Sequence, residues 1–265
     1  NALAAAGFVE TPSFPFTTHD SNDLHGSASG EELPSIKIAN PLDGQAPYLR
    51  RSLVPGLLQV AHRNVSRGLT DLALFEVGAV FLPEPGVQYG TATVPPLAAR
   101  PDDATLAELH ASIPPQPRHV AVLVAGNVAP KTPGHVAIAA DLSDVFAAVA
   151  AIASAAGVDI EISQTRRAAL HPGRAAALTV GGIEVGYAGE LHPEVSAAAD
   201  LSGRVLVAEV DLDAILAGAG ERVVVASLSG YPAATQDVSL VVPADVTAGA
   251  LASALSEGAG VLLES

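Results

Sequence analysis

The amino-acid sequence predicts an α+β fold in which strands, several of them joined as hairpins, alternate with helices. Strand-like segments with alternating or continuous apolar residues recur along the chain, and segments of helical periodicity lie between them. Two strand segments, 176–180 and 183–188, flank Gly181-Gly182, and two glycines between strands are typical of a tight hairpin turn. The chain contains no long internal repeat.

In the first 50 residues the sequence predicts little regular structure. Residues 2–6 favour a helix that stops at Gly7, because glycine readily takes the left-handed conformation that ends helices. We expect a strand over 8–16 that is broken by prolines, a flexible loop over 17–34, and a short strand over 36–38.

A stronger helical pattern follows. Ser52 or Pro55 can open a helix that ends at Gly68, because proline is tolerated in the first helical turn. Its apolar positions share one face, as in a helix that packs on a core; they are Leu57, Leu58, Ala61 and Val65. Residues 71–81 then predict a long, buried strand that contains Glu76.

The remaining elements follow from capping residues and apolar runs. The proline-rich stretch 82–118 leaves room for one short helix near 104–110, and Asp141 or Ser143 caps a helix that runs to about 156 and is closed by Gly157. Further short helices are expected at 212–216 and 247–255. Besides the hairpin, we expect strands at 120–125, 158–163, 205–210, 223–226 and 238–242.

Composition excludes several kinds of site. The 265 residues include no Cys, so a disulfide framework, a thiol nucleophile and a thiolate zinc site are impossible. With 28 Asp and Glu against 13 Lys and Arg, the net charge is −15. A nucleic-acid surface is expected to be basic, so the chain as a whole is a poor partner for phosphates. The sequence also lacks the GxGxxG, GxxxxGK[ST] and GxSxG patterns of phosphate loops and of the hydrolase nucleophile elbow.

The sequence shows neither a targeting signal nor a membrane span. The most apolar stretch, 145–153, is far shorter than the ~20 residues that a membrane helix needs. The chain begins at Asn1 without Met or a basic leader, and both ends look cut from a longer chain. We therefore expect a cytoplasmic fragment with no membrane partner.

Charged residues next to the predicted helix at 55–68 form the first candidate site. Arg50 and Arg51 precede the helix, where a guanidinium near a helix N-terminus can hold an anion. A solvated face or a subunit contact is the preferred explanation. Glu76 lies in an apolar strand, where an unpaired carboxylate is costly. We expect a structural ion pair between Glu76 and either Arg50 or Arg174.

Polar residues at the two ends of the predicted hairpin form the second candidate site. His171 and Arg174 precede one strand, and Glu190 and His192 follow the other. These groups could gather around a metal ion, but Pro193 prevents the helical spacing that a ligand pair would use. Turn and capping roles are the alternative, and we predict no metal site.

Taken together and in order, these segments resemble the bacterial phenylalanine–tRNA ligase β subunit. The resemblance rests on Asn40-Pro41-Leu42, Leu49-Arg50, Ser52–Leu58, Asn64 with Arg67-Gly68, Leu74–Gly78, His171–Arg174, Gly189–Pro193 and Tyr231-Pro232-Ala233. It implies that residues 1–226 are a module similar to a class II aminoacyl-tRNA synthetase core, an antiparallel sheet with flanking helices. It also implies that residues 227–265 are the truncated start of a ferredoxin-fold anticodon-binding domain.

The resemblance further implies a function without catalytic residues in this segment. In the family this module packs on the catalytic α subunit of an (αβ)₂ enzyme, which joins phenylalanine to its tRNA with ATP and Mg²⁺; we expect neither cofactor on this fragment. Residues 75–78 stand where an ATP-binding motif belongs but lack its paired arginine, and residues 234–236 lack the family's usual basic side chains, so the tRNA contacts stay unassigned. Candidates for an interface or structural motif are Arg50, Ser52, Pro55, Gly56, Leu57, Glu76, Gly78, His171, Arg174, Glu190 and His192.

Two alternatives remain open at this point. A stand-alone metal-dependent enzyme could use His171, Arg174, Glu190 and His192 on one rim, and a synthetase paralogue could act by binding a partner. The interface hypothesis predicts that Leu57→Asp weakens association with the α subunit without touching a reacting group.

Overall fold

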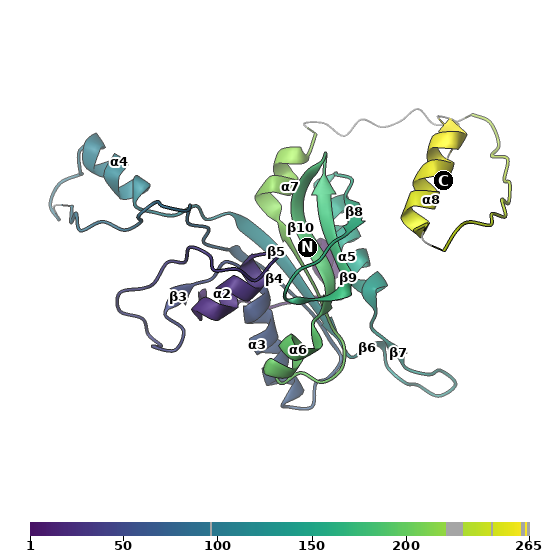
Figure 1. Ribbon diagram of the computed structural model, residues 1–265, viewed down its shortest axis with the longest axis horizontal. Helices are drawn as coiled ribbons and strands as arrows, with labels where there is room; N and C mark the ends of the chain where they lie inside the picture. The colour runs from purple at the N-terminus through teal and green to yellow at the C-terminus, as the bar shows by residue number, and fades with distance from the viewer. Residues whose placement is uncertain (96, 221–229, 245, 261–262, 264–265) are drawn as a thin grey trace. The chain divides into compact units, whose positions relative to one another are not determined.

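The computed structural model describes residues 1–95, 97–220, 230–244, 246–260 and 263 (Figure 1). The chain divides into two compact units, Asn1–Glu221 and Arg222–Ser265, each of which is described by itself. The boundary expected between residues 226 and 227 lies outside the described residues and stays a prediction.

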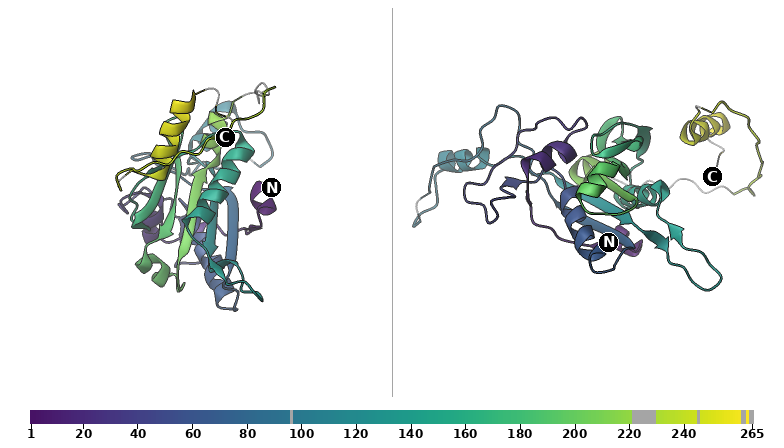
Figure 2. Two further views of the ribbon diagram at one scale, coloured as in Figure 1. Left: turned by 90° about the vertical axis from the view of Figure 1, so that its right-hand side faces the viewer. Right: turned by 60° about the horizontal axis from the view of Figure 1, so that its bottom comes forward.

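The first unit is built on a seven-stranded sheet in the order β1-β4-β5-β11-β10-β9-β8 (Figures 1 and 2). Neighbouring strands are antiparallel except β1 and β4, which are parallel. The expected α+β class with a largely antiparallel sheet is confirmed. The strands are β1 (Val9–Glu10), β4 (Leu72–Ala79), β5 (Arg118–Ala125), β8 (Glu161–Gln164), β9 (Leu170–Val180), β10 (Ile183–Leu191) and β11 (Val205–Asp211).

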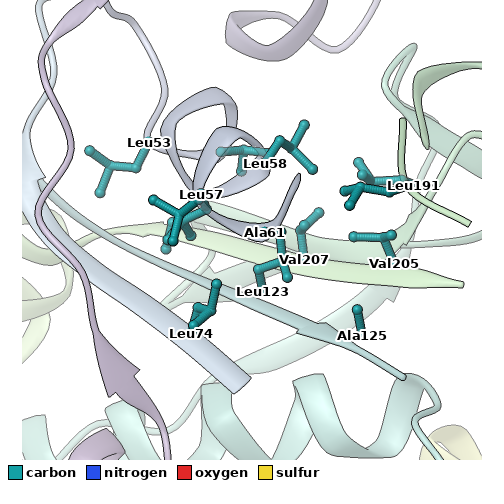
Figure 3. Close-up of a cluster of buried hydrophobic side chains, with 14 of the residues drawn as sticks. Leu53, Leu57, Leu58, Ala61, Leu74, Leu123, Ala125, Leu191, Val205 and Val207 are labelled. Carbon is teal, nitrogen blue, oxygen red and sulfur yellow. The ribbon is translucent and has the colours of Figure 1, made fainter. Parts of the chain in front are cut away.

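Helices cover both faces of this sheet. On one face α3 (Val54–Val65) packs on β4 and β5; on the other, α5 (Leu142–Ala156) and α7 (Leu212–Gly218) pack on β5, β10 and β11, and α1 (Ala2–Ala5) packs on α5. Figure 3 shows α3 side chains, including Leu57 and Ala61, above Leu123 and Val207 of the sheet. Because strand residues alternate between faces, β5 and β11 contribute apolar side chains to both cores.

The predicted helices α3 and α5 are confirmed. In α3 the apolar face is buried, with Leu57 and Ala61 fully inaccessible to solvent. In α5 a capping box between Asp141 and Asp144 satisfies the first backbone N–H groups, and Gly157 ends the helix in the left-handed conformation at φ 70°.

The predicted hairpin is confirmed as β9 and β10. Its turn residues Gly181 and Gly182 have φ of 57° and 81°, the pair of positive angles that a two-residue hairpin turn needs. Strand β9 begins at Leu170, six residues before the expected start, so His171 and Arg174 lie within the strand rather than ahead of it.

Two expectations in the N-terminal region are wrong. Residues 17–34 contain the helix α2 (His19–Gly26), which Thr18 caps. Its buried Asn22 donates to the carbonyl of Leu49 and accepts from the amide of Arg51, so contacts distant in sequence stabilise a helix with little apolar periodicity. Residues 36–38 form only one bridge, between Lys37 and Tyr48, because the neighbouring sheet of β2 (Phe16–Thr17) and β3 (Tyr48–Leu49) is two residues long.

Two connecting segments extend away from the sheet. The proline-rich stretch between β4 and β5 holds the predicted helix, α4 (Asp103–Ala111), none of whose residues is buried. The strands β6 (Asn127–Ala129) and β7 (Ile138–Ala139) form a ribbon that the sequence did not predict. Strand β8 is shorter than the expected 158–163 and begins at Glu161.

The second unit contains the predicted helix near 247–255 as α8 (Ala248–Ala259), which Thr247 caps. The strand expected at 238–242 is wrong: these residues are exposed and pair with no described segment, and a strand needs a hydrogen-bonded neighbour. The strand expected at 223–226 lies outside the described residues. The ferredoxin-like arrangement therefore stays a prediction. In the described part of the chain, no helix has the length and apolar composition to cross a bilayer.

Candidate functional site

A row of polar side chains crosses the sheet beneath the N-terminus of α3. Glu76 of β4 and Glu209 of β11 both pair with Ala121 of β5, and Tyr187 of β10 pairs with Glu209. The two carboxylates therefore lie on the α3 face with one alanine between them. Most of the candidates chosen from the sequence near residues 50–78 gather around this row.

Arg50 and Glu76 form the predicted ion pair. Their side chains meet at 2.7 Å between Nη1 and Oε1, and both residues are buried. Ser13 donates its hydroxyl to Glu76 Oε2 at 2.6 Å, and Arg50 Nε donates to the carbonyl of Ala79 at 3.0 Å. The guanidinium thus joins the segment before α3 to strand β4. Arg174, the other partner considered for Glu76, lies elsewhere.

Two glycines make room for this pair. A Cβ added to Gly78 would collide with Arg50 Nη2 and approach Leu53, and one added to Gly56 would collide with the Ser13 hydroxyl. Neither position has a positive φ, so the requirement is close approach rather than backbone conformation. The candidates Gly56 and Gly78 therefore have a packing role.

Glu209 is the residue that sequence reasoning missed. Its Oε1 accepts from the Leu53 amide at 3.0 Å and contacts His119 Nδ1 at 2.8 Å. Its Oε2 accepts from the Ser52 hydroxyl at 2.5 Å and from the Tyr187 hydroxyl at 3.1 Å. The signal was present in the sequence, since Glu209 interrupts an apolar strand in the same way as Glu76.

The contacts of Glu209 explain how α3 begins. Leu53, at the N-cap position, has no capping side chain. The Glu209 carboxylate supplies the missing acceptor and places a negative charge at the positive end of the helix dipole. The helix is thus capped by a residue more than 150 positions away in sequence.

Burial, hydrogen bonds and neighbouring charges shift the pKa values of three groups in this row, Glu209, His119 and Tyr187. Burial raises the pKa of Glu209, but the bonds from His119, Ser52 and Leu53 outweigh burial and bring that pKa below its usual value. Burial lowers the pKa of His119, yet the Glu209 carboxylate reverses this and the pKa of His119 is raised. Burial and the charge of Glu209 raise the pKa of the Tyr187 phenol. The Glu209 carboxylate is thus fully bound by its neighbours, whereas His119 Nε2 is buried without a hydrogen-bond partner among the described residues. Glu76, Glu209 and Ser52 are all buried, so a substrate would have little access to the row.

The hairpin candidates form a separate group. Arg174 Nη1 donates to both Glu190 oxygens, at 3.0 and 2.9 Å, and Arg204 lies 3.7 Å from the same carboxylate. His171 Nδ1 accepts from the Gly173 amide, and His192 Nδ1 accepts from the Glu194 amide at the start of α6 (Pro193–Ala198). Both histidines thus have turn or capping contacts. Among the described residues, no group of three His, Asp or Glu side chains is arranged to hold a metal ion.

Leu57 and Pro55 differ in their surroundings. Leu57 is fully buried in the core beneath α3. Pro55 lines a cleft of about 1160 Å³ between α2, α3 and α6. His25 of α2 also lines this cleft; it is 5% exposed, and its Nδ1 has no hydrogen-bond partner.

We expect acid to destabilise the protein through His25. Burial lowers its pKa from 6.5 to about 4, so the folded state binds the proton less readily than the unfolded chain. The contribution to stability is full above pH 6.5 and is lost as the pH falls through about 4, a loss of about 3 kcal/mol. His25→Phe should remove this part of the pH dependence of the unfolding free energy between pH 7 and pH 4.

Urea denaturation followed by circular dichroism measures this difference. The exposed His135, changed to Phe, is the matched control and should keep the wild-type loss. An unchanged pH dependence in His25→Phe would contradict the assignment.

Comparison with known proteins identifies the architecture. The profile of the family described as the phenylalanyl tRNA synthetase beta chain CLM domain matches residues 1–212, most of the chain. The chain belongs to this family. The match covers the sheet and all of its polar row.

Curated relatives of the family extend the similarity to the whole chain. The phenylalanine–tRNA ligase beta subunit of Leifsonia xyli is 51% identical over 99% of this chain, and that of Cutibacterium acnes is 41% identical over 100%. In both cases the aligned part is 31% of the relative, so the chain spans about a third of the length of these proteins.

Solved structures show the same fold at low identity. Two structures of a pyrrolysyl tRNA synthetase from Desulfitobacterium hafniense match with TM-scores of 0.50 and 0.51 at 13% and 15% identity. Each match covers 81% of this chain and 64% of the other. The expected class II synthetase-like fold is thus confirmed for the sheet and helices.

Proposed function

We propose that this chain is part of the β subunit of a cytoplasmic phenylalanine–tRNA ligase and acts there as a structural module. The whole enzyme would be an (αβ)₂ heterotetramer that attaches phenylalanine to its tRNA with ATP and Mg²⁺. In this proposal residues 1–226 dock the catalytic α subunit, and residues from 227 begin the anticodon-binding domain.

The sealed polar row is the observation that carries this proposal. A catalytic sheet must present its polar groups to a substrate. Here Glu76, Glu209 and Ser52 are at most 3% exposed. Glu76 accepts a hydrogen bond from Ser13, and Glu209 accepts one from Ser52. Apolar side chains of α3 pack over the rest of that face. The face supports a packed core rather than a reaction site.

The donor set of this face does not fit Mg²⁺ and ATP. Magnesium prefers carboxylates that retain room for water and phosphate oxygens, and the carboxylates of the row are already bound by Arg50, Ser13, Ser52, His119 and Tyr187. We therefore assign both cofactors to the partner subunit.

The structure refines the interface candidates. Glu76 and Gly78 of β4 are among them, and Val77, which lies between them in the sequence, is 45% exposed and lines the same pocket as Leu216 of α7. Leu57 is buried, so Leu57→Asp would damage the fold and could not report on docking alone. An exposed apolar residue is the better probe.

We expect Val77→Asp to reduce association with the α subunit at least tenfold, because a carboxylate would lose its hydration in an apolar contact. Co-expression of the complete β subunit with a tagged α subunit, followed by quantified co-purification, measures the effect. The phenylalanylation rate of the mixture should fall in parallel.

Ile183→Asp at the hairpin turn is the matched control, since Ile183 is also an exposed strand residue, at 67%. It should co-purify at the wild-type level, and both variants should unfold at similar urea concentrations. Wild-type recovery of Val77→Asp would refute this docking surface, while failure of any β subunit to bind the α subunit would refute the proposed function.

A further inference from the structure

The cleft between α2, α3 and α6 shares no lining residue with the surface around Val77 that is proposed to dock the α subunit. Its lining includes Leu24 and His25 of α2, Leu58 and Arg63 of α3, and Val195 and Asp200 at α6 and just beyond it. Its volume of about 1160 Å³ is at the upper end of the range for small-molecule sites. Apolar walls with a few polar groups are the usual composition of such sites.

His25 is the polar group that sets this cleft apart. It is 5% exposed, lines the cleft, and forms no hydrogen bond through Nδ1. A buried nitrogen without a partner costs free energy, so nearly all such groups in proteins are satisfied by a protein atom, a water or a ligand. Because burial lowers the pKa of His25 to about 4, the ring is neutral at pH 7 and offers one donor and one acceptor.

The charged groups of the cleft favour a cation. The carboxylates of Asp20, Glu194 and Asp200 line it together with the guanidinium of Arg63. His62 lies 3.7 Å from Asp200, and His192 lies 3.9 Å from Glu194. The carboxylates outnumber the guanidinium, and the Asp200 side chain is 90% exposed and thus available to a ligand.

The backbone at Asp200 is also unusual. Its φ of 54° is the one positive value at a non-glycine position in the described residues. Asp200 follows Ala199, the C-cap residue of α6, and lines the cleft.

We propose that this cleft binds a small apolar amine whose hydroxyl or amide group hydrogen-bonds to His25 and whose ammonium group lies near Asp20, Glu194 and Asp200. The apolar body of the ligand would contact Leu24, Leu58 and Val195.

Three related probes test each part of this proposal on the full 265-residue chain. Tyramine carries the ammonium, the ring and the hydroxyl; phenethylamine lacks the hydroxyl; 3-(4-hydroxyphenyl)propanoate has a carboxylate in place of the ammonium. We expect tyramine to bind most tightly, phenethylamine roughly fivefold to tenfold more weakly for the loss of one hydrogen bond, and the propanoate not at all. Calorimetry gives the affinities, and the imidazole nitrogen shifts of ¹⁵N-labelled His25 report direct contact.

Variants separate ligand binding from folding. His25→Phe keeps a planar aromatic side chain and removes an unpartnered polar group, so it should be at least as stable as wild type at pH 7 and should bind tyramine and phenethylamine equally. Asparagine adopts the same left-handed backbone conformation as Asp200, so Asp200→Asn should keep the fold and weaken tyramine binding severalfold. Glu161→Gln on β8, outside the cleft, is the charge-matched control and should bind as wild type does.

Three results would each overturn the proposal. The first is the absence of measurable tyramine binding at 10 mM, which is roughly 10² times the Kd of a modest small-ligand site. The others are equal affinity for tyramine and the propanoate, and a His25→Phe variant that still prefers tyramine to phenethylamine. Destabilisation by His25→Phe at pH 7 would show that the ring has a structural partner instead.

Discussion

Replacement of Glu209 by alanine is expected to lower the free energy of unfolding by about 3 to 5 kcal/mol, the range for breaking a buried charged network. The variant leaves the Ser52 and Tyr187 hydroxyls, the Leu53 amide and the His119 ring without their acceptor. It also removes the cap of α3, whose buried face forms the core of this side of the sheet. The chain has no Trp, so far-UV circular dichroism during urea titration is the suitable measurement.

Two variants accompany this measurement. Glu161→Ala on the edge strand β8 is the control, because Glu161 is exposed, and its change should stay within about 0.5 kcal/mol. Glu209→Gln keeps the shape and one acceptor oxygen, so its loss should be intermediate. A Glu209→Ala protein as stable as the control would show that the contacts of Glu209 do not hold α3 on the sheet.

Arg50→Met is expected to cost a similar 3 to 5 kcal/mol, because it leaves the Glu76 carboxylate buried without its countercharge. The Arg50→Met/Glu76→Leu double variant should recover part of that loss, since apolar residues of similar volume often replace a buried ion pair at little cost. The same urea titrations give the coupling free energy between the two positions.

The exposed pair of Arg118 and Asp213 provides the matched control. Their atoms approach to 2.6 Å, closer than the buried pair, but the side chains are 59% and 42% exposed. Water screens such a pair, so Arg118→Met should cost at most about 1 kcal/mol. Two results would contradict the role given to the buried pair. One is an equal loss of unfolding free energy in Arg50→Met and Arg118→Met; the other is a double variant that is less stable than Arg50→Met alone.

Local patterns in the sequence were sufficient to predict the helices and strands that bury one apolar face. The periodicity of α3, the capping residues of α5 and the two glycines of the β9–β10 turn each act over a few neighbouring residues. The cost of an unpaired carboxylate in an apolar strand likewise indicated the ion pair of Glu76 without any structure.

The partners of these residues depended on tertiary structure. Nothing in the sequence distinguished Arg50 from Arg174 as the partner of Glu76, because the choice follows from strand order and register. Helix α2 escaped prediction because contacts of the buried Asn22 stabilise it rather than an apolar stripe.

Where burial repeats with a short period, the amino-acid order is therefore enough to locate the helices and strands. The capping of α3 by Glu209 and the position of His25 in a cleft follow only from the three-dimensional arrangement, because residues far apart in the chain meet there. Hydrogen bonds and ion pairs act over about 3 Å in space, and for residues far apart in the sequence the chain order does not fix that distance.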